Sequence, residues 1–202
     1  MITLLSVEVE MPRSLVMDPP LTDCEFEVLC AANDLLQIER TREGEIKMQA
    51  PAGGFSSRGN AEINGQLYVW WNTHRRGSLS DSSGGFFLSD GSVLSPDAAY
   101  LVPEKLQGLT KHDLTGFPRL CPDFVIELLS LSDSLPKTRE KMERWIENGA
   151  TLGWLIDPYQ KKVYIYGAGR EAAVVSGKIA LGSGPVEGFT FDLDRLWRCY
   201  EI

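Results

Sequence analysis

Three side chains in this sequence have the types and positions that metal-assisted hydrolysis needs: Asp97, Glu127 and Lys141. Asp97 follows Pro96 at the head of an expected strand, and Glu127 lies inside an otherwise apolar run at 124–129. Adjacent strands of one sheet would bring the two carboxylates together, and carboxylate oxygens are the preferred ligands of Mg²⁺. Lys141, in the helix expected to follow, would orient a water molecule or stabilise a pentavalent phosphorus. This combination suits the hydrolysis of phosphodiester bonds.

Each of these residues also has an ordinary structural interpretation. Asp97 could simply form a turn after proline, as aspartate often does. Glu127 could face solvent from its strand, although its neighbours are apolar and a buried carboxylate is costly unless it is paired, protonated or bound to a metal. Lys141 could be a solvated lysine in a helix that mixes both signs of charge. The residues alone leave these alternatives open.

The stretch 122–158 must position these side chains, and its pattern predicts strand, helix, strand. The apolar run at 124–129 is the first strand. Pro136 near the start and Gly149 just past the end are the usual boundaries of a helix. A second apolar run, 152–156, stops at Asp157-Pro158. We expect the rest of the chain to be built around this unit.

The remaining elements predict a mixed α/β (α+β) domain with a central sheet flanked by helices. Thr22 and Glu25 form a capping-box pattern that would start a helix reaching about Ala32. Residues 1–21 are expected to form an N-terminal arm, and 22–202 a single domain with a β-rich C-terminal tail. The other expected elements are strands at 35–39 and 45–49, a helix at 57–74, strand fragments at 86–88 and 98–102, a strand at 162–166, and a short helix at 192–197.

Composition places the chain among soluble globular proteins. Its 202 residues, 43% hydrophobic and 24% charged, suffice for one domain with a substantial core. No apolar run approaches the roughly 20 residues that span a bilayer, and the N-terminus lacks the basic region of a secretory signal. We therefore expect a cytoplasmic protein that has no membrane association. The cysteines show no CxxC pair and are expected to be reduced: Cys24, Cys30, Cys121 and Cys199.

The net charge of −8 and the pI of about 4.9 disfavour tight binding to DNA. Most non-specific affinity for a polyanion comes from lysine and arginine. An acidic chain can still bind nucleic acid through a local basic groove or through bridging metal ions. The glycine pattern at 167–172 predicts a hairpin turn rather than a dinucleotide-binding motif, because no helix is expected after it. His74 and His112 do not predict a zinc site, because neither has a histidine or cysteine at zinc-ligand spacing.

An ordered set of motifs between about Thr22 and Trp197 resembles a bacterial family described as putative restriction endonucleases, domain of unknown function 820. This family is placed in the PD-(D/E)XK nuclease superfamily. The order and spacing of the motifs are more specific than any one of them. The motifs are Ile38-Glu39-Arg40-Thr41, Pro51-Ala52-Gly53-Gly54 with Asn60-Ala61-Glu62-Ile63, Ser95-Pro96-Asp97-Ala98, Pro122-Asp123-Phe124-Val125-Ile126-Glu127, Lys141-Met142, Gly149-Ala150, Gly153-Trp154-Leu155-Ile156-Asp157-Pro158 and Gly188-Phe189.

The resemblance implies specific roles for the acidic residues. Asp97 resembles the metal-binding aspartate of the superfamily, and Glu127 resembles the acid of its (D/E)XK element. The backbone carbonyl of Leu128 would be a further metal ligand. Leu129 stands where that element places its lysine, so Lys141 on the next helix is the candidate replacement.

A helical acid also belongs to the superfamily's pattern. Glu62 resembles this auxiliary acid, although a surface salt bridge is an equal alternative, and Glu39 is a rival for the same place. The resemblance implies a Mg²⁺- or Mn²⁺-dependent endonuclease that acts on nucleic acid, with DNA as the expected partner. The acidic balance and the displaced lysine motivate an alternative, a catalytically inactive nuclease scaffold that serves as a binding or regulatory partner. A homodimer is a further expectation, from the exposed aromatic residues.

Overall fold

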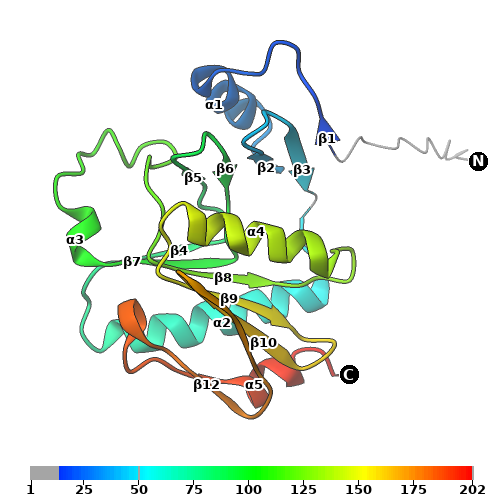
Figure 1. The fold of residues 1–202 in the computed structure, drawn as a ribbon, viewed down its shortest axis with the longest axis vertical. Coiled ribbons are helices and arrows are strands. Elements are labelled where there is room, and N and C mark those ends of the chain that lie inside the picture. The colour runs from blue at the N-terminus through cyan, green and yellow to red at the C-terminus, as the bar shows by residue number, and fades with distance from the viewer. Residues whose placement is uncertain (1–13, 50, 202) are drawn as a thin grey trace, which may run out of the picture.

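The computed structural model describes residues 14–49 and 51–201, and its centre is a six-stranded mixed sheet (Figure 1). The strands lie in the order β11-β10-β9-β8-β7-β4. Only β8 and β9 are parallel, and helix α4 connects them, as a parallel pair requires. The bounds are β4 (Ser78–Asp81), β7 (Ala98–Leu101), β8 (Phe124–Leu128), α4 (Leu135–Glu147), β9 (Leu152–Asp157), β10 (Lys162–Gly167) and β11 (Arg170–Val175).

Helices cover the two faces of this sheet. Helix α2 (Gly54–Asn72) packs Ile63 and Leu67 on one face, and α4 packs Met142 and Trp145 on the other. Strand β8 alternates between the faces: Phe124, Ile126 and Leu128 join the α2 side, while Val125 joins the α4 side. The period of two therefore directs the side chain of Glu127 toward α4.

A second sheet, in the order β1-β3-β2-β6-β5, lies beside α4 together with α1 (Figure 1). Arg40 of β2 is buried and stabilises this part of the molecule, because it pairs with Asp23 of α1 at 2.5 Å and donates to the carbonyls of Leu21 and Gly91. The bounds are β1 (Ser14–Leu15), α1 (Asp23–Ala32), β2 (Gln37–Arg40), β3 (Ile46–Gln49), β5 (Phe86–Phe87) and β6 (Val93–Leu94).

The C-terminal tail completes the α2 side of the core. Strands β12 (Ile179–Leu181) and β13 (Thr190–Asp192) pair with each other, and α5 (Leu193–Arg198) contacts α2. Two short helices, α3 (Pro103–Leu106) and the 3-10 helix η1 (Gly184–Val186), lie in connections. Phe189 of the tail stacks on Trp154 of β9 with a centroid distance of 5.6 Å. The tail therefore belongs to the same folded unit as the central sheet.

The predicted mixed α/β fold is confirmed, with differences at particular elements. The capping box of Thr22 and Glu25 is formed, and 167–169 is a hairpin turn between β10 and β11. Helix α2 begins at Gly54 rather than at 57, and the sequence did not predict β4 and β6 as separate strands. The expected arm at 1–21 is described only from Ser14, where β1 pairs with β3; residues 1–13 lie outside the described residues. In the part of the chain that the structure describes, no helix is both long and apolar enough to cross a membrane.

Candidate active site

Glu127 and Lys141 meet on the α4 face of the central sheet. The ammonium nitrogen of Lys141 lies 2.9 Å from Oε1 and 3.1 Å from Oε2 of Glu127. The indole of Trp145, one helical turn further along α4, donates to Oε1 at 2.8 Å. The side chain of Glu127 is 7% exposed and that of Lys141 is 19% exposed. The sequence has Leu129 where the (D/E)XK element would place its lysine. The structure places Lys141 of α4 against Glu127 instead.

Glu39 of β2 is a second acidic partner of the same lysine. Its Oε1 lies 2.8 Å from the ammonium nitrogen of Lys141 and accepts a hydrogen bond from the backbone N–H of Ser95 at 2.8 Å. The carbonyl of Ser95 accepts from Lys141 at 2.8 Å. An ammonium group has three N–H donors, and Glu127, Glu39 and Ser95 provide an acceptor for each of them.

Asp97 lies immediately before β7, and its carboxylate is fixed by two hydrogen bonds. Oδ2 accepts from the backbone N–H of Leu128 at 2.7 Å, and Oδ1 accepts from the amide of Asn60 on α2 at 2.9 Å. The backbone carbonyl of Asp97 also accepts from Asn64, one turn further along α2, at 3.2 Å. Because Leu128 follows Glu127 in the chain, these bonds hold Asp97 beside the Glu127–Lys141 pair.

The site carries more negative than positive charge. Glu127 and Glu39 contact the single ammonium of Lys141, and Asp97 is a third acid, close enough to interact with its charge. Burial raises the pKa of Glu127 to about 8: the charge of Lys141 offsets only part of this effect, and the charges of Asp97 and Glu39 add to it. Burial also raises the pKa of Asp97, despite its hydrogen bonds from Leu128 and Asn60.

The pKa of Lys141 moves in the direction that keeps the ammonium charged. Burial alone would lower this pKa, but the negative charges of Glu127 and Glu39 outweigh burial and raise it. The lysine therefore stays positive at neutral pH, and the excess negative charge must be neutralised by protons or by a bound cation.

The residues present fit a hard divalent cation in chemistry and charge. Carboxylate oxygens are the ligands that such ions prefer, and raised carboxyl pKa values mark a site that gains from a further positive charge. Asn60 adds a buried amide oxygen that has no hydrogen-bond partner among the described residues. Within those residues, no group of three or more His, Cys, Asp or Glu side chains is already arranged as a metal cluster. A bound ion would therefore require these side chains to move.

Glu62 lies apart from this cluster although it shares helix α2 with Asn60. Its Oε1 pairs with the Nε of Arg195 on α5 at 2.9 Å, and it also accepts from Gln66 at 2.8 Å. Glu39 is the other candidate for the auxiliary acid, and unlike Glu62 it contacts Lys141. The structure thus brings together Asp97, Glu127, Lys141 and Glu39, with Leu128 contacting Asp97 through its amide.

Changing Glu62 to glutamine is expected to have only a small effect. The ion pair with Arg195 is partly solvated, and such pairs contribute about 0–1 kcal/mol. Cleavage of a labelled oligonucleotide should change by less than about threefold, because the charge removed faces α5 rather than Lys141. A large loss of activity at unchanged thermal stability would instead assign Glu62 a place in the reaction.

The pKa of Glu127 predicts how stability depends on pH. A carboxyl that titrates near 8 in the folded state and near 4.5 when unfolded binds more protons in the folded state between these values. Stability should therefore fall as pH rises through this range, by a few kcal/mol. Glu127→Gln, which cannot ionise, should flatten the fall. Urea unfolding of both proteins in EDTA at pH 5 and pH 8.5 measures the difference, and parallel pH profiles would contradict the assignment.

Asn60, Ser95 and Trp145 join the site although their types did not mark them as candidates. Two weak signals were available: Trp145 lies four residues after Lys141, on the same helical face, and Asn60 and Ser95 lie inside motifs quoted for the family resemblance. Tyr200 also lies near Asp97. Burial raises the pKa of its phenol, and the neighbouring Tyr159 phenol and Asp97 carboxyl add to the effect.

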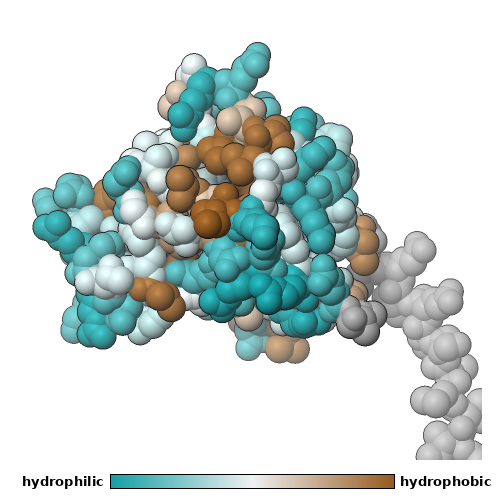
Figure 2. Space-filling view, turned by 90° about the horizontal axis from the view of Figure 1, so that it is seen from below, coloured by the Kyte–Doolittle hydropathy of each residue, from teal (hydrophilic) through white to brown (hydrophobic). Residues whose placement is uncertain are grey.

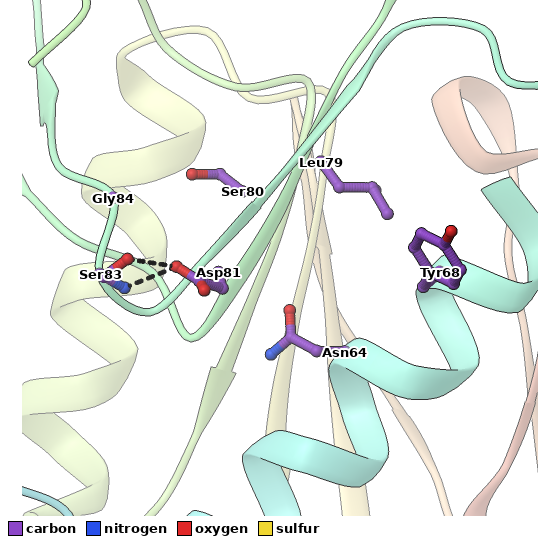
Figure 3. Close-up of a pocket in the computed structure, with 7 residues that line it drawn as sticks. All are labelled: Asn64, Tyr68, Leu79, Ser80, Asp81, Ser83 and Gly84. Atoms are coloured by element: carbon purple, nitrogen blue, oxygen red, sulfur yellow. Dashed lines mark hydrogen bonds between the residues drawn. The ribbon is translucent and has the colours of Figure 1, made fainter. Parts of the chain in front are cut away.

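A shallow groove of about 410 Å³ lies between α2 and β4, and Asn64 is one of its lining residues (Figure 3). Its walls carry polar groups and Tyr68, and Asp81 there accepts hydrogen bonds from Ser83. The groove is lined by none of the four residues of the buried cluster, which are Glu39, Asp97, Glu127 and Lys141. These candidate site residues from the sequence therefore lie in the buried cluster and not in the groove.

The mixed sheet, with one acid immediately before β7 and a second acid inside β8, has the restriction-endonuclease-like fold. A family model described as "Putative restriction endonuclease" matches residues 24–194, so the chain belongs to that family. The fold is similar to the crystal structure of a putative nuclease of domain of unknown function 820 from Anabaena variabilis ATCC 29413. The TM-score is 0.67 at 20% identity, over 80% of this chain and 90% of the other. No curated protein sequence matches this chain.

Proposed function

We propose that this protein is a divalent-metal-dependent endonuclease that hydrolyses phosphodiester bonds, with DNA as its substrate and Mg²⁺ or Mn²⁺ as its cofactor. The observation that carries the proposal is the convergence of Asp97, Glu127 and Lys141, from two strands and a helix, on one buried and negatively charged site. Membership of the family supports the choice of nucleic acid as substrate.

The roles follow from the contacts of each residue. Asp97, Glu127 and the backbone carbonyl of Leu128 would hold the metal ion, which when bound neutralises phosphate charge and activates water. Lys141 would position the attacking water or stabilise the developing negative charge. Its three donors already have protein acceptors, so one of these contacts, such as that with Glu127, must be released to free an N–H for water. Glu39 would then keep the ammonium in place.

A comparison of substrates and metals tests this proposal directly. Purified protein is incubated with supercoiled plasmid, linear duplex, single-stranded DNA and RNA, each with Mg²⁺, Mn²⁺ or EDTA. We expect internal cleavage of DNA with either metal and none in EDTA. Cleavage that is unchanged in EDTA would contradict metal dependence, and intact substrates under all conditions would contradict the nuclease assignment.

A second candidate function is a catalytically inactive scaffold that binds a partner. The observation that favours it is that protein groups already bind the acids. Both carboxylate oxygens of Asp97 accept hydrogen bonds from protein donors, and Lys141 forms an ion pair with Glu127. Calorimetric titration with Mn²⁺ separates the two candidates. Saturable binding that Asp97→Asn abolishes would count against an inactive site.

We also propose that the protein forms a homodimer through β11, the edge strand of the central sheet. Figure 2 views the molecule from the end where β12 lies in Figure 1 and shows an apolar area surrounded by polar side chains. On β11 and β12, the exposed apolar side chains are Val174, Ile179 and Leu181. A free strand edge can pair antiparallel with the same edge of a second copy. The cytoplasmic location is likewise a proposal, supported by four cysteines that are free thiols.

Introducing a charge on β11 tests the homodimer. Val174→Lys places a cation among exposed apolar groups on the edge strand and is expected to convert the dimer into a monomer. The matched control is Val69→Lys, on the exposed side of α2, which should leave the dimer intact. Size-exclusion chromatography with light scattering measures the mass. A native protein that is monomeric at all concentrations would contradict the proposal.

A further inference from the structure

Three aromatic side chains from distant parts of the chain form a cluster beside the candidate active site. Phe55 comes from the first turn of α2, Tyr159 from the turn between β9 and β10, and Tyr200 from the C-terminal end. The rings of Phe55 and Tyr200 are stacked at 5.9 Å with an interplanar angle of 16°, and Tyr159 meets Tyr200 edge-on at 5.7 Å. Figure 1 shows these three segments at the same side of the molecule. We call them the aromatic cluster.

The aromatic cluster is exposed on its outer side and adjoins the site on its inner side. Phe55 is 36% and Tyr159 43% exposed, so both rings remain in contact with solvent. The Tyr200 hydroxyl and the Leu128 side chain both approach Gly59 so closely that a Cβ there would lie 2.6 and 2.7 Å from them. Leu128 binds Asp97 through its backbone N–H. One layer of side chains therefore separates the cluster from Asp97.

Basic side chains lie beside this cluster, although acidic side chains also lie near Tyr159 and the whole chain has a net charge of −8. Arg58 lies one turn after Phe55 and donates to the carbonyl of Arg198 at 3.5 Å, so both arginines lie at the C-terminal end beside Tyr200. Among the described residues, neither arginine forms an ion pair with a carboxylate. Lys161 lies two residues after Tyr159 and pairs with Glu201 at 3.3 Å. The charges of the two arginines are therefore available to a phosphate backbone.

We propose that the aromatic cluster binds an unpaired nucleobase next to the scissile phosphate, and that the substrate is therefore single-stranded nucleic acid. This inference rests on the proposed function. Exposed aromatic faces interleaved with arginines are the combination that binds single strands, because every base can stack on a ring while the cations contact the phosphates. A base paired within a duplex does not present its face to such a cluster. Phe55 and Tyr159 supply the stacking surfaces, and Arg58 and Arg198 supply the charge.

The test measures binding without cleavage. Fluorescence anisotropy in EDTA compares a labelled single-stranded oligothymidylate, the same oligomer with abasic sites, and a duplex of equal length. The native protein should bind the base-containing single strand at least about 10-fold more tightly than the abasic strand. Tyr159→Ala should remove most of this difference, while Tyr159→Phe should keep it because the ring remains. Arg58→Gln should weaken binding of all three ligands and reduce its dependence on salt.

The matched control is Tyr68→Ala, which removes an exposed ring from the same helix far along α2 and should leave binding unchanged. Equal affinity of the native protein for base-containing and abasic strands would overturn the inference, as would equal losses for Tyr68→Ala and Tyr159→Ala. The two proposals fail separately. A protein that binds bases through the cluster but never cleaves refutes the nuclease, and cleavage without base-dependent binding refutes the cluster.

Discussion

Replacing Lys141 by methionine is expected to lower the free energy of unfolding by about 3 to 5 kcal/mol at pH 8.5, above the pKa of Glu127, because it leaves buried carboxylates without their cation. Glu39 and Glu127 both contact this ammonium and are 5% and 7% exposed. The same change should abolish cleavage, since no other cation contacts Glu127 in the described part of the chain. Urea denaturation followed by circular dichroism measures the loss of stability.

Two further variants separate the loss of charge from the loss of packing. Lys137→Met alters an exposed lysine in the first turn of the same helix and should change stability by less than about 0.5 kcal/mol. Adding Glu127→Gln to Lys141→Met removes one of the stranded carboxylates and should restore part of the stability. If Lys141→Met and Lys137→Met are equally stable, the buried ion-pair network does not contribute as described.

Replacing Asp97 by asparagine is expected to reduce metal-dependent cleavage by about 100- to 1,000-fold or more while the fold is retained. Burial raises the pKa of Asp97, so a neutral amide of the same shape is at no disadvantage in that environment. Asn60 can rotate its amide so that its unpartnered oxygen accepts from the new side chain. The melting temperature should therefore be unchanged or higher, while both the affinity for the metal and the rate of cleavage at saturating metal should fall.

The matched control for this prediction is Asp81→Asn in the groove shown in Figure 3. Asp81 is an exposed acid on the strand that pairs with β7, opposite Ala98, but it does not contact the lysine site. Its replacement should leave cleavage within about twofold of the native rate. Full activity of the Asp97→Asn protein at saturating Mg²⁺ would remove Asp97 from the reaction.

The elements with a clear periodic pattern could be predicted from the sequence, and the short strands could not. The apolar run of β8 and the boundaries of α4 set by Pro136 and Gly149 are local signals. Strands β4 and β6 have four and two residues, and they form only because β7, β2 and β5 offer partners. Pairing between distant segments leaves little trace in the local sequence.

In the candidate site too, contacts set by spacing within one helix could be predicted from the sequence, and contacts between distant segments could not. Lys141 and Trp145 lie four residues apart on one helical face, so the spacing alone indicates that both can contact the same group, which is Glu127. Helical geometry also separates Asn60 from Glu62, because two residues along a helix point to nearly opposite sides. Glu39 reaches Lys141 only through the packing of the N-terminal sheet beside α4, which no local pattern on β2 reveals.

The position of a bound Mn²⁺ ion in a crystal tests the central claim most directly. The account predicts one anomalous peak at the site, with oxygen atoms of Asp97 and Glu127 both about 2.1 Å from the ion and the Lys141 nitrogen within hydrogen-bonding distance of a metal-bound water. A crystal soaked at saturating Mn²⁺ in which the ion binds elsewhere, while Lys141 keeps its bonds to both glutamates, would contradict it.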